Sequence, residues 1–247
     1  AVFLLGTGTA ANALTLATLT PPWGTVFCTP MAHVNEDECN APEFFTGGAK
    51  LTLVSAPQAK LTPGALDRAI AAEGGRGVHG PARGPVSLTQ ATEKGTIYTI
   101  EDLRAISDLA HGYGLPVQMD GARFANALVR LGCSAAEMTW KAGIDAVSFG
   151  GSKNGLLGVE AVVFFDPARA GEFAFRRKRG GHLFSKHRYL AAQMGAYLAG
   201  GLWLDMARTA NARADRLAEG LRAIPGVSLV WPPEANLMFF RAPRRLH

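Results

Sequence analysis

The chain has 247 residues, of which 48% are hydrophobic and 18% are charged, and 29 residues are glycine. This composition excludes a disordered chain, a collagen and a coiled coil, and the length fits one large α/β domain, alone or with part of a second domain. The net charge of +5 includes one basic run, Arg176–Arg179, which predicts an anionic ligand or a solvated helix end rather than a nucleic-acid-binding surface.

Short apolar runs alternate with helical patterns along the chain. Strands are predicted at residues 2–5, 25–28, 50–54, 86–89, 116–119, 146–149, 161–165 and 227–231. Helices are predicted at residues 10–19, 62–73, 100–112 and 125–131, and over one long stretch at 186–223. Continuous apolar strands separated by helices are typical of a mostly parallel sheet with helices on both faces. The sequence therefore predicts a three-layer α/β/α domain, with its ligand site beyond the carboxyl ends of the strands.

The first predicted strand is followed by the turn Gly6-Thr7-Gly8-Thr9, which opens an apolar helix. Glycine permits unusual backbone angles, and the free amides of a first helical turn together with threonine hydroxyls suit a phosphate group. The same residues nearly match the dinucleotide fingerprint, but no acidic residue stands at the end of the second strand to hold a ribose hydroxyl. The turn is interpreted as a phosphate site, with a dinucleotide site and an ordinary tight turn as alternatives.

Two later strands end in side chains that suit catalysis. Residues 117–123 bring Asp120 and Arg123 to one strand end. An aspartate there would bind a metal, act as a base or pair with a protonated heterocycle nitrogen, and a helix N-cap is the structural alternative. Residues 145–155 form a strand that runs into a glycine-rich loop with one lysine, Lys153. Such a lysine fits a Schiff-base role, and a turn lysine without a role is the alternative.

The cysteines and the apolar runs predict the cellular compartment of the protein and some of its partners. Cys28, Cys39 and Cys133 are odd in number and lack metal-ligand spacing, so neither a zinc site nor a disulfide framework is expected. No apolar run reaches the roughly 18 residues that a membrane span needs, and the first residues do not have the order of a secretory signal. We therefore expect a cytoplasmic protein with no metal, no membrane partner and no nucleic-acid partner.

A phosphate turn, a histidine loop, a strand-end aspartate and a lysine 33 residues later are the parts of a pyridoxal-phosphate site. Five stretches carry a resemblance: GTGTAAN from Gly6, HVNEDECNAPEFFTGGAKL from His33, SLTQATEKGTIYTIEDL from Ser87, QMDGAR from Gln118 and SFGGSKNG from Ser148. On these stretches the sequence resembles the low-specificity L-threonine aldolase family, and within it the phenylserine aldolase type. That family implies an aspartate-aminotransferase-like fold of type I.

The resemblance implies roles for the residues that would hold pyridoxal 5′-phosphate. Lys153 is expected to bind the cofactor as a Schiff base. Asp120 is expected to pair with the pyridine nitrogen, and Arg123 to contact the ring hydroxyl region. Gly8 and Thr9 are expected to hold the phosphate.

Further residues are implied by the same resemblance. His33 is expected to stack over the cofactor ring and to take the β-hydroxyl proton of the substrate, directly or through a water. Glu38 and Gln90 are expected in a substrate loop, although residues 89–93 lack the second histidine of many members, so a two-histidine mechanism is not expected. A homodimer or homotetramer with shared sites is implied, in which Lys178 and Lys186 contact the phosphate in a partner subunit.

Chains of this family are longer at both ends, so an incomplete aldolase chain is expected. Residues 1–199 are expected to form the cofactor-binding large domain without its N-terminal segment. Residues 200–247 are expected to begin a small α+β domain. The arginine that binds the substrate carboxylate is expected outside this chain.

The resemblance implies a lyase of amino-acid metabolism, acting in threonine catabolism and glycine synthesis. It would cleave L-threonine, L-allo-threonine or phenylserine-like β-hydroxy-α-amino acids to glycine and an aldehyde. The alternatives are another pyridoxal-phosphate-dependent β-eliminating lyase of the same fold, an NAD-dependent oxidoreductase that uses the Gly6 turn, and a non-catalytic remnant.

Overall fold

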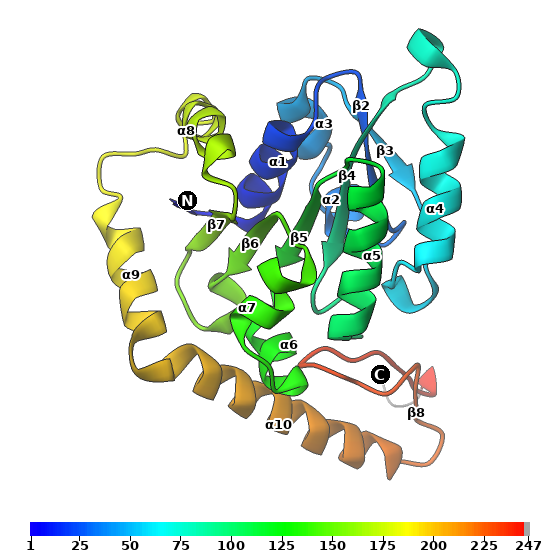
Figure 1. Ribbon diagram of the computed structural model, residues 1–247. Coiled ribbons are helices and arrows are strands. Elements are labelled where there is room, and N and C mark those ends of the chain that lie inside the picture. The colour runs from blue at the N-terminus through cyan, green and yellow to red at the C-terminus, as the bar shows by residue number, and fades with distance from the viewer. Residues whose placement is uncertain (245–247) are drawn as a thin grey trace.

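A seven-stranded sheet forms the middle layer of the protein in the computed structural model, which describes residues 1–244 (Figure 1). The strand order is β1-β7-β6-β5-β4-β2-β3. The strands are β1 (Val2–Leu5), β2 (Gly24–Cys28), β3 (Lys50–Leu53), β4 (Ala82–Thr89), β5 (Val117–Gly121), β6 (Ala146–Gly150) and β7 (Glu160–Phe164). β7 runs antiparallel to both of its neighbours, β1 and β6, and all other neighbouring strands of this sheet are parallel. The predicted mostly parallel sheet is confirmed.

Helices cover both faces of the sheet (Figure 1). One face carries α1 (Gly8–Leu19), α3 (Ala41–Thr46) and α8 (Ala170–Arg179), and the other carries α4 (Pro63–Ala72), α5 (Ile100–Gly112), α6 (Phe124–Leu131) and α7 (Ala135–Met138). Side chains alternate along a strand, so Ala146 packs in the core under α1 while its neighbour Val147 packs in the core under α5 and α6. The two cores establish the three-layer α/β/α architecture.

The predicted long helix at 186–223 is wrong in one respect, because the structure divides it. The two helices are α9 (Arg188–Leu198) and α10 (Leu202–Arg222). Between them Gly200 and Gly201 have φ of 60° and 78°, a left-handed conformation that ends the first helix and turns the chain. The second helix then packs against α6, where Asn126 Nδ2 donates to Asn211 Oδ1 at 3.1 Å.

The basic run Arg176–Arg179 forms the last turn of α8. Positive side chains are favourable at a helix C-terminus, where the backbone carbonyls carry partial negative charge. Arg176 also pairs with Glu172 of the same helix at 2.7 Å. Lys178 and Arg179 are exposed, whereas Arg176 and Arg177 are half-buried and donate to the carbonyls of Phe45 and Leu4, so only part of the run is a solvated helix end.

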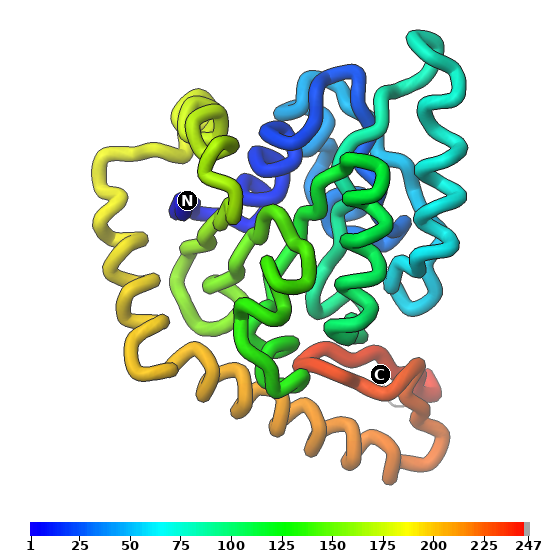
Figure 2. The backbone as a smooth tube through the Cα atoms, in the orientation of Figure 1, coloured from blue at the N-terminus to red at the C-terminus, as the bar shows by residue number. Residues whose placement is uncertain are grey.

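The C-terminal segment returns beside α10 (Figure 2). Its short strands β8 (Ser228–Leu229) and β9 (Phe240–Arg241) pair with each other, so the strand predicted at 227–231 is shorter than expected. The loop between them packs on residues 92–97, where Trp231 Nε1 donates to the Lys94 carbonyl at 2.7 Å. Residues 245–247 of the predicted second domain lie outside the described residues. None of the described helices is long and apolar enough to cross a membrane.

One close backbone approach in the sheet gives a stability prediction. A Cβ atom added to Gly84 of β4 would lie 2.3 Å from the Thr25 carbonyl oxygen of β2. We expect Gly84→Ala to lower the free energy of unfolding by about 2 kcal/mol, measured by urea denaturation, because the strands must separate. Gly112→Ala is the matched control, since an added Cβ meets nothing within 4 Å there and alanine favours the end of α5. Equal effects of the two substitutions would contradict this prediction.

Candidate active site

A cavity of about 360 Å³ lies beyond the carboxyl ends of β1, β5 and β6. It is lined by the turn at residues 6–9, by His33 at the start of α2 (His33–Glu36), by Asp120 of β5 and by Lys153 of a short 3-10 turn. This edge is where open α/β sheets bind ligands. The structure therefore brings together the phosphate turn, the histidine, the aspartate and the lysine that were singled out in four separate stretches of sequence.

The phosphate turn leads directly into α1. The hydroxyl of Thr7 caps this helix by accepting from the Ala10 amide at 3.2 Å, and the first turn contains no acidic residue. The first amides of a helix have no carbonyl partner within it, so they are available to an anion. A Cβ added to Gly6 or Gly8 would meet nothing within 4 Å, which leaves open space beside the turn. Gly8 and Thr9 both line the cavity, as expected.

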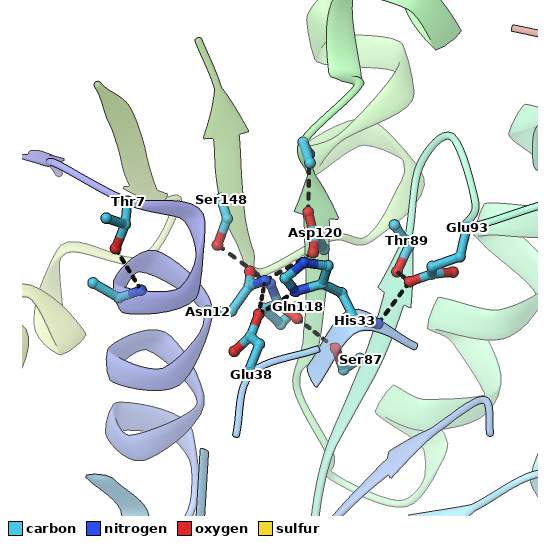
Figure 3. Close-up of polar contacts among 12 residues, drawn as sticks. Thr7, Asn12, His33, Glu38, Ser87, Thr89, Glu93, Gln118, Asp120 and Ser148 are labelled. Carbon is cyan, nitrogen blue, oxygen red and sulfur yellow. Dashed lines mark hydrogen bonds and ion pairs between the residues drawn. The ribbon is translucent and has the colours of Figure 1, made fainter. Parts of the chain in front are cut away.

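Asp120 lines the cavity and is only 5% exposed. Its Oδ1 atom accepts from the Ala122 amide at 2.9 Å, and its Oδ2 atom accepts from Asn12 Nδ2 at 2.8 Å (Figure 3). Because each oxygen has a donor, the carboxylate is held in one orientation. A ligand in the cavity therefore meets a fixed acceptor.

His33 pairs with Glu38, which follows α2 in the chain. The His33 Nδ1 atom lies 2.9 Å from Glu38 Oε1, and this bond raises the pKa of His33 above its usual 6.5 against the opposing effect of burial. Burial raises the pKa of Glu38, while the bonds from His33 and Asn12 oppose that rise. When Nδ1 carries the proton toward Glu38, the Nε2 atom of the neutral ring is an acceptor. His33 is thereby able to receive a proton.

The loop that carries Lys153 is anchored on both sides. Before the lysine, the buried Glu160 carboxylate accepts from the amides of Gly151 at 3.0 Å and Ser152 at 3.4 Å. After it, Asn154 Nδ2 donates to the Tyr197 hydroxyl at 2.6 Å. Lys153 itself lines the cavity and is not buried, so its amine is accessible to a ligand.

Five of the predicted site residues do not line this cavity: Glu38, which reaches it only through its bonds to His33 and Asn12, and Gln90, Arg123, Lys178 and Lys186. Gln90 is fully buried, because its amide nitrogen donates to the Tyr98 carbonyl at 2.9 Å and its oxygen accepts from the Tyr98 amide at 3.0 Å. Those bonds hold the side chain in the core, outside the cavity. Lys178 and Lys186 are exposed outside the cavity, and Lys178 Nζ approaches the Leu183 carbonyl at 3.5 Å.

Arg123 is another of these residues and stands directly before α6. Burial lowers the pKa of its guanidinium, and the negative charges of Asp120 and Glu93 partly offset this effect. The guanidinium is therefore in the electrostatic range of the Asp120 carboxylate, although it is not part of the cavity wall.

Sequence reasoning missed two polar side chains next to His33 and Asp120. Asn12, one helical turn beyond the phosphate turn, bridges the carboxylates of Asp120 and Glu38. Glu93 accepts from the backbone amide of His33 at 2.9 Å and from the Thr89 hydroxyl at 2.7 Å, and burial raises its pKa. Both residues stand inside the matching stretches, but nothing in their spacing shows that they face these partners.

The chemistry of the cavity suits an anionic ring compound better than a metal ion. Within residues 1–244, no group of three or more His, Cys, Asp or Glu side chains is placed to hold a metal. The cavity instead offers an anion site at the start of α1, a carboxylate, an imidazole and a primary amine. These groups fit the phosphate, ring nitrogen, ring face and aldehyde of pyridoxal phosphate, in that order.

Comparisons with known proteins agree with this arrangement. The profile of the beta-eliminating lyase family matches residues 1–242. Two curated proteins, each called low specificity L-threonine aldolase, from Pseudomonas aeruginosa and another Pseudomonas strain, are 48% and 45% identical to this chain over 240 residues. These residues are 97% of this chain and 69% of each relative. The structure of a threonine aldolase from Leishmania major superposes with a TM-score of 0.90 at 27% identity, over 97% of this chain and 69% of that one.

Proposed function

Because this chain belongs to the beta-eliminating lyase family, we propose that it is a pyridoxal-phosphate-dependent threonine aldolase. It cleaves the Cα–Cβ bond of L-threonine, L-allo-threonine or phenylserine-like β-hydroxy-α-amino acids and releases glycine and an aldehyde. The observation that carries the proposal is the single cavity that joins the phosphate turn, His33, Asp120 and Lys153. Curated threonine aldolases at 45–48% identity support the same substrate class.

Each residue of the cavity is proposed to bind a different part of the cofactor. The cofactor supplies an electron sink for the pair of electrons released when the bond at the substrate α-carbon breaks. Lys153 provides the amine that holds the cofactor aldehyde, and the turn with Gly8 and Thr9 holds its phosphate. Asp120, whose two oxygens are oriented by donors, would pair with the ring nitrogen and favour its protonated form through its negative charge. Arg123, whose charge interacts with that of Asp120, would contact the ring hydroxyl region of the bound cofactor.

His33 is the residue that takes a proton from the substrate β-hydroxyl, directly or through a water. Its backbone is held by Glu93 and its ring by Glu38, so the imidazole has little freedom to turn. With Nδ1 bonded to Glu38, the Nε2 atom is the free base. The base must be neutral to act, and therefore activity increases as the pH rises through the pKa of His33.

This role predicts a pH effect of Glu38→Gln. The Glu38 carboxylate raises the pKa of His33, Asp120 adds to that rise, and Lys153 opposes it. Without the carboxylate the pKa of His33 decreases, so the acid limb of the kcat/KM profile is expected to move to lower pH. Glu36→Gln makes the same chemical change on the exposed side of α2 and is the control. An unchanged acid limb in Glu38→Gln would argue against His33 as the base.

The activity itself is tested by measuring glycine release from L-threonine, L-allo-threonine and phenylserine in the presence of added pyridoxal phosphate. The proposal expects glycine and the matching aldehyde in equal amounts from at least one substrate. Elimination that yields ammonia and an oxo acid without glycine would favour another lyase of the same fold. Binding of NADH without binding of pyridoxal phosphate would favour an oxidoreductase.

We also propose the setting in which the enzyme acts. It is a cytoplasmic homodimer or homotetramer in which Lys178 and Lys186 reach the phosphate site of a partner subunit, and their exposure outside their own cavity supports this arrangement. Free thiols at Cys28, Cys39 and Cys133 agree with a reducing compartment. Residues 1–199 act as the cofactor-binding domain, and the chain from the break at Gly200 onward belongs to a smaller domain. Sedimentation at several protein concentrations measures the assembly.

A further inference from the structure

The Asn12 side chain lies between the carboxylates of Asp120 and Glu38 (Figure 3), and Asn12 and Asp120 both line the active-site cavity. Its Nδ2 atom is 2.8 Å from Asp120 Oδ2 and 2.9 Å from Glu38 Oε1. An amide NH₂ group has two hydrogens, so each carboxylate receives one of them. Asn12 is only 2% exposed, so both bonds are buried.

The orientation of the Asn12 amide follows from a second set of contacts. Gln118 Nε2 donates to Asn12 Oδ1 at 3.3 Å, and the Gln118 oxygen accepts from the Ser87 hydroxyl at 2.7 Å. A flipped Asn12 amide would place its oxygen against two carboxylate oxygens and its NH₂ group against another NH₂ group. The network therefore permits a single orientation, with the donors toward Asp120 and Glu38.

The same Glu38 oxygen also bonds His33, at 2.9 Å from Nδ1. The other oxygen, Glu38 Oε2, is buried and has no partner among the described residues. The position of the Glu38 carboxylate thus depends on two bonds to a single atom, one from His33 and one from Asn12. Asp120 likewise has one donor from Ala122 and one from Asn12.

We propose that Asn12 is a positioning residue that couples Asp120 to the Glu38–His33 pair. One amide group orients the Asp120 carboxylate toward the position of the cofactor nitrogen and orients the Glu38 carboxylate toward the His33 ring. The proposal rests on the proposed function and adds to it a residue that touches neither the reacting bond nor the proton that moves. Without this amide, two nearby buried carboxylates lose their shared donor, and their mutual repulsion is no longer offset.

The test compares Asn12→Ala and Asn12→Ser with Asn126→Ala. Asn126 is also a buried asparagine with an amide partner, Asn211. It belongs to α6, its side chain faces α10, and it lies outside the cavity. Serine keeps one donor, so it is able to serve only one of the two carboxylates. Asn126→Ala measures the general cost of losing a buried amide, and thermal unfolding checks that all three variants fold.

Two of the readouts need no turnover. In the cofactor-free protein, the ¹⁵N spectrum of the His33 ring reports which nitrogen carries the proton, and titration with pyridoxal phosphate gives its Kd. Asn12→Ala is expected to change the His33 spectrum, to raise the Kd at least about tenfold and to lower kcat more than it changes KM. The values for Asn12→Ser are expected to lie between those for Asn12→Ala and wild type. Asn126→Ala is expected to match wild type in the His33 spectrum, the Kd and the kinetic constants.

The outcomes separate this inference from the proposed function. A wild-type protein that binds pyridoxal phosphate but releases no glycine contradicts the proposed function, while the His33 spectrum and the Kd still decide the role of Asn12. Folded Asn12→Ala with an unchanged His33 spectrum and an unchanged Kd would overturn the inference. Equal changes in Asn126→Ala would also overturn it, and so would a failure of both Asn12 variants to fold, since each result assigns Asn12 to general stability.

Discussion

Replacing Lys153 by alanine is expected to lower the rate of glycine release by at least about 10³-fold. Lys153 is the lysine that lines the cavity, where it stands with Asp120 and the phosphate turn. Alanine removes the amine that is proposed to hold the cofactor aldehyde and leaves the anchors of the loop, Glu160 and Asn154, in place. The loss is therefore chemical, and the fold is expected to remain.

The measurement pairs turnover with covalent trapping. Wild-type protein is incubated with pyridoxal phosphate, reduced with borohydride and digested, and mass spectrometry is expected to find the reduced cofactor on Lys153. Lys141→Ala is the control, because Lys141 is exposed, lies outside the cavity and is directed over the Trp140 ring. Turnover by Lys153→Ala equal to that of wild type would refute the assignment of Lys153, and so would an adduct on another lysine.

The second large effect is expected for Asp120→Asn. The Asp120 carboxylate would provide the negative charge that pairs with the cofactor nitrogen, and an amide of the same shape carries no charge. An asparagine also presents donor hydrogens to the Asn12 amide or to the Ala122 amide, each of which now donates to Asp120. We expect kcat to fall by about 10²- to 10³-fold, because the transition state loses an oriented charge in a closed site. The absorbance spectrum of the bound cofactor is expected to change with it.

Asp145→Asn provides the comparison for this effect. Asp145 stands just before β6, at the end of the strand away from the cavity, and accepts from the Val117 amide at 2.7 Å and pairs with His111 at 2.9 Å. This substitution is expected to lower stability modestly and to leave kcat and the cofactor spectrum close to those of wild type. A small change in kcat for Asp120→Asn, comparable to that of the control, would show that the charge at position 120 is not needed.

The regular elements that position the site were predictable because their signals are local. The α5 prediction, residues 100–112, coincides with the observed helix, where Thr99 and Asp102 form a capping box within four consecutive residues. The short helix α2, which carries His33, was not predicted, since four residues are too few for a hydrophobic period. Its position depends instead on Glu93, which is 60 residues away in the chain.

The sequence by itself determined the sheet, the strand ends and the identity of the groups that meet there. Apolar runs and helix signals act over a few residues, and the connections of a parallel sheet bring the carboxyl ends of its strands to one edge. The turn at residues 6–9, Asp120 and Lys153 could therefore be assigned to one site before their distances were known. The resemblance to an aldolase family added the roles of these residues, and the family itself is confirmed.

Only the tertiary structure decided which polar side chains face one another. Gln90 was expected near the substrate and is turned into the core by two bonds to Tyr98. Asn12 had no predicted role, yet its amide joins Asp120 to Glu38, residues 108 and 26 positions away in the chain. The physical reason is that a buried polar group must find a partner, and the partner within reach is set by the packing of α1 against the sheet and not by any spacing in the sequence.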